Sequence, residues 1–175
     1  MVRSIAVIMV PLLVIVFLFT NNLRDHPVES VDYAPVLQTA RAEAPWPVLA
    51  PTGLPTEGEA AWTPTRVSWQ KLGQPGLNDA PSPRNEWKIG YLGPDEIYYS
   101  VNQGDGPPTD FIGPATSGGA KLTGDVTAAG RQWERFEQAD GPTRSLVNRS
   151  EQVTTVVSAD ADFDKLAQFA ETLGS

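Results

Sequence analysis

The chain opens with an apolar segment, residues 4–20 ("SIAVIMVPLLVIVFLFT"), that carries no charge over 17 positions. As a helix rising 1.5 Å per residue, a segment of this length spans about 25 Å, at the short end of what crosses a bilayer. Pro11 lies inside it, and transmembrane helices tolerate proline where neighbouring groups satisfy the freed carbonyl. The segment therefore predicts a transmembrane helix over residues 4–20.

A cleaved signal peptide is the alternative interpretation of this segment. The start "MVR" fits one, but the apolar run continues into "FLFTNN" without a small-x-small cleavage site. The chain has no cysteine, which excludes a lipoprotein anchor and disulfides. We therefore expect a single-pass protein of the plasma membrane. Residues 1–3 would form a cytoplasmic tail, 21–30 a polar exit linker and 31–175 an extracytoplasmic domain, although Arg3 and Arg24 orient the helix only weakly.

The part of the chain after residue 20 is acidic. It holds 12 Lys and Arg against 21 Asp and Glu, a net charge of −9. Nucleic-acid binding requires basic patches, and anionic lipid attracts basic segments. The charge balance therefore argues against a nucleic-acid partner and against a domain that lies flat on anionic lipid.

Two segments precede the expected strands. The stripe Tyr33, Val36, Leu37 and Ala40 predicts a short helix near residues 31–43, with Ser30 as its cap. Residues 45–55 ("PWPVLAPTGLP") follow and should be extended, because each proline fixes φ and restricts the residue before it. Their apolar side chains favour packing on a folded body, so the outer domain is expected to include the proline-rich segment 45–64. Residues 56–65 are the better candidate for a free linker.

The remainder of the chain has the pattern of an antiparallel sheet. Alternating apolar and polar residues predict strands in 65–72, 86–93, 96–103, 131–137, 143–151 and 152–159, and residues 93–95 predict a hairpin turn. One helical turn is expected near residues 109–113, and Phe163, Leu166 and Ala170 mark a C-terminal amphipathic helix. The fold class is therefore α+β: an N-terminal transmembrane helix, an antiparallel sheet of about five to seven strands, a packed C-terminal helix and the short helix near 31–43. The helices should cover one face of the sheet, leaving the other wet or available for binding.

Motifs for catalysis or metal binding are weak. His26 is the only histidine, which nearly excludes zinc sites and serine triads. Residues 113–121 approach a phosphate-binding loop, but the lysine and hydroxyl positions do not match. "DADFDKLAQFAE" places acids at calcium-loop spacing, yet Lys165 replaces the required glycine, which favours helix capping. We therefore predict no catalytic residue, no cofactor and no metal ligand.

Aromatic residues are the remaining candidates for contact with a partner or ligand. Trp87, Tyr91, Tyr98 and Trp133 could line a groove for an apolar ligand, although most such residues belong to a core. The strand "RQWERFE" around Trp133 is expected at an edge of the sheet, where another chain can dock.

Several motifs together resemble one family. "VDYAPVLQTARAEAPWPVLAP", "WKIGYLGPD", "GRQWERFE" and "TTVVSADADFDKLAQFAETL" are similar, in this order, to the actinobacterial family catalogued as domain of unknown function 4245. The resemblance covers nearly the whole chain. It implies a single-pass membrane protein with an outer domain, and it implies no activity and no catalytic residues.

The function expected from these observations is non-enzymatic. We expect a membrane-anchored module in the cell envelope that binds a protein partner or an apolar ligand through its sheet face or the Trp133 strand. One alternative is a hydrolase that uses carboxylates such as Glu96, Asp105 and Glu134, which would have to lie about 5–9 Å apart. Another is an assembly factor whose anchor contacts a second membrane protein.

Overall fold

The computed structural model of the chain describes residues 28–76 and 79–175. The predicted transmembrane helix at 4–20 and His26 lie outside these residues. In the described ranges, none of the helices has the length and apolar character needed to cross a bilayer.

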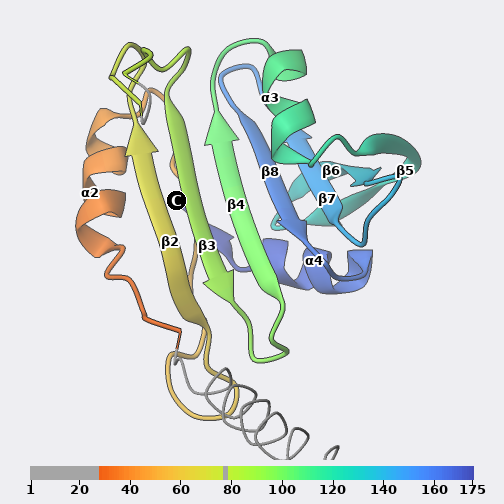
Figure 1. The fold of residues 1–175 in the computed structure, drawn as a ribbon. Helices are drawn as coiled ribbons and strands as arrows, with labels where there is room; N and C mark the ends of the chain where they lie inside the picture. The colour runs from red at the N-terminus through yellow and green to blue at the C-terminus, as the bar shows by residue number, and fades with distance from the viewer. Residues whose placement is uncertain (1–27, 77–78) are drawn as a thin grey trace, which may run out of the picture.

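A seven-stranded antiparallel sheet forms the centre of the fold (Figure 1). Its strands lie in the order β2-β3-β4-β8-β7-β6-β5, so β8 returns to pair with β4 after the chain has built the other half of the sheet. The α+β class with an antiparallel sheet is therefore confirmed. The strand bounds are β2 (Thr63–Gln70), β3 (Glu86–Leu92), β4 (Tyr98–Gly104), β5 (Ala120–Ala128), β6 (Arg131–Glu137), β7 (Arg144–Arg149) and β8 (Thr154–Ala159).

Alternation along the strands sets which side chains enter the core. In β3, Trp87, Ile89 and Tyr91 all point to one face and are buried there, as the sequence pattern predicted. Every residue of the central strand β8 is buried, because helices cover the sheet on both sides at this point. Its β-branched sequence "TTVV" suits such a position.

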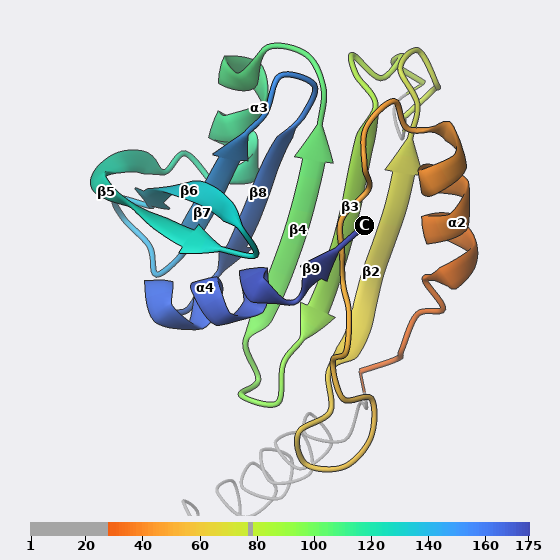
Figure 2. The same cartoon turned by 180° about the vertical axis from the view of Figure 1, so that it is seen from behind.

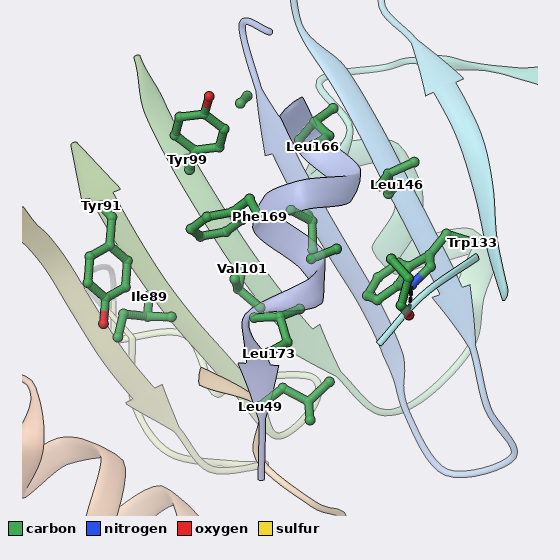
Figure 3. Packing of buried hydrophobic residues seen from close by; sticks show 14 of the residues in the cluster. Leu49, Ile89, Tyr91, Tyr99, Val101, Trp133, Leu146, Leu166, Phe169 and Leu173 are labelled. Atoms are coloured by element: carbon green, nitrogen blue, oxygen red, sulfur yellow. Dashed lines mark hydrogen bonds between the residues drawn. The ribbon is translucent and has the colours of Figure 1, made fainter. Parts of the chain in front are cut away.

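The first face of the sheet carries the main core. Helix α4 (Phe163–Glu171) lies across this face, and β9 (Leu173–Gly174) pairs with β1 (Ala50–Pro51) beside it (Figure 2). Leu166, Phe169 and Leu173 point from this layer onto Val101 and its neighbours in the sheet (Figure 3). The side chain of Asp162 caps α4 by accepting the Lys165 backbone N–H at 2.8 Å, so the helix-capping interpretation of this acidic segment is confirmed.

Residues 45–55, the proline strap, also lie on the first face. Trp46, Val48 and Leu49 are buried there, as their apolar character predicted. Side chains of the sheet satisfy the strap backbone at Leu49: its N–H donates to Gln103 Oε1 at 2.7 Å, and its carbonyl accepts from Trp87 Nε1 at 3.0 Å. The strap is therefore an ordered layer of the core.

The segment that follows the strap is packed as well. Trp62 stacks on Phe169 with ring centroids 5.3 Å apart and lies 5.0 Å from the ring of Tyr99. The sequence predicts residues 56–65 as the better candidate for a free linker. Trp62 and the start of β2 instead hold the C-terminal part of this segment on the core.

Helix α2 (Ala34–Glu43) runs along β2 at one edge of the sheet (Figure 1). It lies within the predicted range, and Ala40 is buried at its centre. Ser30 does not cap it. The helix begins later, and Asp32 Oδ1 accepts the Ala34 N–H at 3.1 Å instead.

Two predictions about the second half of the fold are wrong. Helix α3 (Pro108–Ala115) is longer than one turn and packs on the second face, so helices do not share a single face. β5 forms the outer edge beyond β6, so the strand "RQWERFE" is not an edge strand. The sequence did not predict β5 because glycine and polar residues interrupt the alternation in "AKLTGDVTA". As the outer strand, β5 leaves most of its residues exposed.

Candidate functional site

The second face of the sheet is divided into two halves. α3 covers the half formed by β8, β7 and β6, where Phe111 and Ile112 pack on Phe136, Val147 and Val156. The half formed by β2, β3 and β4 carries no helix (Figure 1). We call the hollow between α3 and this half the open cleft. It has a volume of about 400 Å³ and is lined mainly by polar side chains from β2, β3, β4 and the loop before β3.

Two glycines make room for aromatic walls in the cleft. A side chain at Gly90 would overlap the phenol of Tyr98, which lies directly over this glycine. A Cβ at Gly104 would lie 2.6 Å from the ring of Phe111. Gly90 and Gly104 therefore let one aromatic ring settle at each end of the cleft.

The floor between the two rings is polar. Lys88 lies opposite Asn102 in the β3–β4 register, and Gly90 lies opposite Ser100. Asn102 Nδ2 approaches Ser100 Oγ at 3.4 Å. Lys88 Nζ pairs with Glu86 Oε1 at 2.9 Å. The floor thus offers amide and hydroxyl groups beside one neutralised ion pair.

Arg84 stands at the Phe111 end of the cleft, in the loop before β3. Its guanidinium lies over the Phe111 ring, 5.5 Å from the centroid, and Nη2 donates to the Asp110 backbone carbonyl at 3.3 Å. Nη1 is buried and has no hydrogen-bond partner among the described residues. A buried donor without an acceptor costs about 1–3 kcal/mol, and more when it is charged.

Tyr98 forms the opposite wall and is 44% exposed. Partial burial of the phenol against the sheet raises the pKa of Tyr98, and the positive charge of Arg66 opposes that shift only in part. The phenol therefore remains a neutral hydrogen-bond donor over the physiological range. Of the four aromatic residues predicted to contact a partner or ligand, Tyr98 alone is exposed.

The other three predicted contacts are core residues, which corrects that part of the prediction. Trp87 and Trp133 are fully buried, and Tyr91 is 3% exposed. Trp133 Nε1 donates to the carbonyl of Ala128, the last residue of β5, at 3.0 Å, which ties β6 to the end of β5. Tyr91 packs edge-on against Tyr33, with centroids 6.0 Å apart. The strand alternation that aligned these rings also turned them inward, so they cannot form a surface groove.

The carboxylates considered for a hydrolase do not converge. Glu96 precedes β4 and Asp105 follows it, which separates them by about 30 Å of extended chain. Glu134 lies three strands from β4 and pairs with Lys121 at 2.6 Å. Within residues 28–76 and 79–175, no group of three or more acidic or histidine side chains is placed to hold a metal ion.

Apart from Tyr98, sequence patterns did not single out the residues that line the open cleft. A signal existed for the floor, because the positions of β3 and β4 that alternate with the buried ones carry Lys88, Gly90, Ser100 and Asn102. No signal pointed to Arg84, which the fold brings to the cleft from a loop rich in proline.

These elements define the protein as an α+β domain built on a seven-stranded antiparallel sheet, with the main core on the first face and a second face that α3 covers only in part. The chain belongs to the family described as "Protein of unknown function (DUF4245)", whose model matches residues 1–173. The match confirms the resemblance found in the sequence. No curated protein matches the chain.

Proposed function

We propose that this protein is a membrane-tethered, non-enzymatic binding module of the cell envelope, and that it binds through the open cleft. In this proposal, residues 4–20 anchor the chain as a single transmembrane helix and the sheet domain lies outside the cytoplasm. The observation that carries the proposal is the half-open second face, where the strands β2, β3 and β4 carry no helix beside the part that α3 covers.

The character of the open half supports a binding role. Where no helix covers the second face, β3 and β4 carry polar residues such as Lys88, Ser100 and Asn102, which suit a surface that faces water. A hollow of about 400 Å³ falls within the usual range for small-molecule sites, about 300–1,000 Å³. The walls are preformed, since Tyr98 and Phe111 are seated on glycines.

The contact surface in this proposal is the open cleft and not the buried rings of Trp87, Tyr91 and Trp133. An apolar ligand would require exposed apolar side chains, and on this face Tyr98 is the one large ring that is strongly exposed among the described residues. A polar ligand or a polar partner segment suits the cleft better.

A blocking variant tests the site. In the full-length chain, Ser100→Trp would fill the cleft floor, and Thr127→Trp would add the same side chain on the exposed edge strand β5 as a control. Binding partners captured from native membranes should be lost with Ser100→Trp and retained with Thr127→Trp, at matched thermal stability. Equal capture by both variants would contradict the open cleft as the binding surface.

The absence of native cysteine allows a clean test of the tether. Thr123→Cys places one thiol on the exposed strand β5. A membrane-impermeant maleimide should label this thiol in intact cells. Labelling that requires lysed cells would show that the domain faces the cytoplasm, and release of the protein by salt alone would show that residues 4–20 do not anchor it.

A further inference from the structure

We propose that the open cleft binds a small soluble molecule through an anionic group, a carboxylate or a phosphate, with the guanidinium of Arg84 as the anchor. This inference rests on the proposed function, because it names the ligand class of the same cleft. Arg66 provides a second positive charge at the Tyr98 end.

The charges of the cleft are unusual for this chain. Arg66, Arg84 and Lys88 line it together with Glu86 and Asp110. Lys88 and Glu86 neutralise each other at 2.9 Å. Neither arginine has a carboxylate oxygen within 4.0 Å in the described part of the chain, although acidic residues outnumber basic ones by nine after residue 20. Two arginines without ion pairs in one hollow therefore make a local positive site in an acidic protein.

The geometry of Arg84 favours an oxyanion. A guanidinium presents a planar fork of donors that matches the two oxygens of a carboxylate or phosphate. In Arg84 that fork is only half used, since Nη2 makes one long bond of 3.3 Å and Nη1 makes none. Binding requires the guanidinium to turn so that Nη1, which is buried, meets the ligand, and the long Nη2 hydrogen bond and the contact with the Phe111 ring would have to loosen for this. The ligand oxygen then supplies the acceptor that the protein does not.

The acidic surface does not overcome this local attraction. At physiological ionic strength the Debye length is about 8 Å, so distant carboxylates are largely screened and the nearest charges dominate. Asp110 is an opposing carboxylate in the lining of the cleft, and its Oδ1 accepts a hydrogen bond from the Thr109 hydroxyl at 3.2 Å. Beside the arginines, Ser100, Asn102 and the Tyr98 hydroxyl offer donors to the rest of a polar ligand.

The place of Arg84 in the fold favours a soluble ligand over a lipid headgroup. The described chain enters the sheet where Val31 N–H donates to the Pro64 carbonyl at 2.8 Å, at the Leu92 end of β3. Arg84 lies beyond the opposite end of β3, about 23 Å further along the sheet. If the N-terminal segment enters the membrane, the anchor of the cleft faces the aqueous side. The backbones of the two arginines are also about 13 Å or more apart along the strands, so Arg84 is the anchor in this proposal and Arg66 is a second charge at the other end of the cleft.

Arginine side-chain NMR tests the inference directly. The ¹⁵N-labelled full-length protein in non-ionic maltoside micelles is titrated with inorganic phosphate and with citrate, while sodium chloride holds the ionic strength constant. The Nε–Hε resonance of Arg84 and the backbone amides of Ser100 and Asn102 should shift saturably with at least one anion. Arg84→Gln should weaken the affinity at least tenfold, and Arg84→Lys should weaken it less, because a point charge remains. Arg131→Gln on β6 removes the same charge outside the cleft and should leave the affinity unchanged.

Other outcomes overturn the inference. Shifts that do not saturate, or that are equal at Arg84 and Arg131, would show non-specific ion binding. Unchanged affinity in Arg84→Gln would remove Arg84 as the anchor. If phosphate-containing lipid vesicles shift the same resonances while soluble phosphate and citrate do not, the ligand is a headgroup and the soluble class is wrong. If no anion binds but the Ser100→Trp block still abolishes capture, the proposed function stands and the anion proposal fails.

Discussion

The substitution Gln103→Met tests how the proline strap is held on the sheet. Gln103 lies in β4 and is 1% exposed. Its Oε1 accepts the Leu49 N–H at 2.7 Å, and its Nε2 donates to the Pro47 carbonyl at 3.3 Å and to Thr155 Oγ1 at 3.2 Å. One side chain thus replaces the partner strand that residues 47–49 lack. Methionine keeps nearly the same volume and removes every one of these bonds.

The expected cost follows from the groups left without partners. The Leu49 N–H remains buried with no acceptor, at a cost of about 1–3 kcal/mol, and the loss of the bonds to Pro47 and Thr155 adds about 1 kcal/mol. Added apolar contact from methionine recovers a fraction of this. We therefore expect the free energy of unfolding to fall by about 2–4 kcal/mol, and Tm to fall by about 4–15 °C for a domain of this size.

Urea unfolding of the full-length protein in micelles measures this change, with Gln132→Met, an exposed position on β6, as the matched control. Amide hydrogen exchange adds a local readout. The Leu49 amide should be strongly protected in the parent chain and should exchange much faster in Gln103→Met. A change below about 0.5 kcal/mol, with Leu49 still protected, would refute the claim that Gln103 holds the strap.

Three further perturbations address the core, the cleft wall and the ion pair between Lys165 Nζ and Asp95 Oδ2, which lie 2.9 Å apart. Trp133→Ala should lower the free energy of unfolding by about 3–5 kcal/mol in urea titrations, because it empties a fully buried site; a change under 1 kcal/mol would place this ring outside the core. Gly90→Ala should cost about 1–3 kcal/mol by displacing the Tyr98 ring, and adding Tyr98→Ala should remove most of that cost; additive losses in the double variant would show no contact between the two positions. Partial burial disfavours ionised Asp95, but the hydrogen bonds from Lys165, Tyr99 and the Ile97 backbone outweigh it and lower the pKa of this carboxyl. A lowered pKa means that the stabilisation is present above about pH 4 and is lost as the pH falls through the folded-state value. Asp95→Asn should therefore flatten the acid side of the Tm–pH profile, and an unchanged profile would contradict a stabilising role for this ion pair.

Local patterns predicted much of the fold because they are set by residue chemistry. The alternation of Trp87, Ile89 and Tyr91 identified β3 and its buried face, and the spacing of Phe163, Leu166 and Ala170 identified α4. The apolar residues of the strap indicated that it packs on the domain. Each of these features depends on the spacing or the type of neighbouring residues, which can be read directly from the sequence.

Features that depend on the arrangement of whole elements were not predictable in the same way. The place of α3 on the second face follows from the crossover between β4 and β5, which no local pattern specifies. The same crossover makes β5 the edge strand, so β6 lies inside the sheet, where Trp133 is buried in the main core. The open cleft exists because α3 covers only part of the second face, so its residues became visible as a group only in the folded chain.

Site-specific photocrosslinking in living cells tests most directly whether the open cleft is the binding surface. A photoreactive amino acid is placed in the full-length protein at Ser100 on the cleft floor, or at Thr127 on β5 as the reference position. The intact mass of the purified protein then reports any adduct, small or large. We expect a discrete, reproducible adduct at Ser100 and no adduct of that mass at Thr127. Equal adducts at both positions, or an adduct at Thr127 alone, would contradict this expectation.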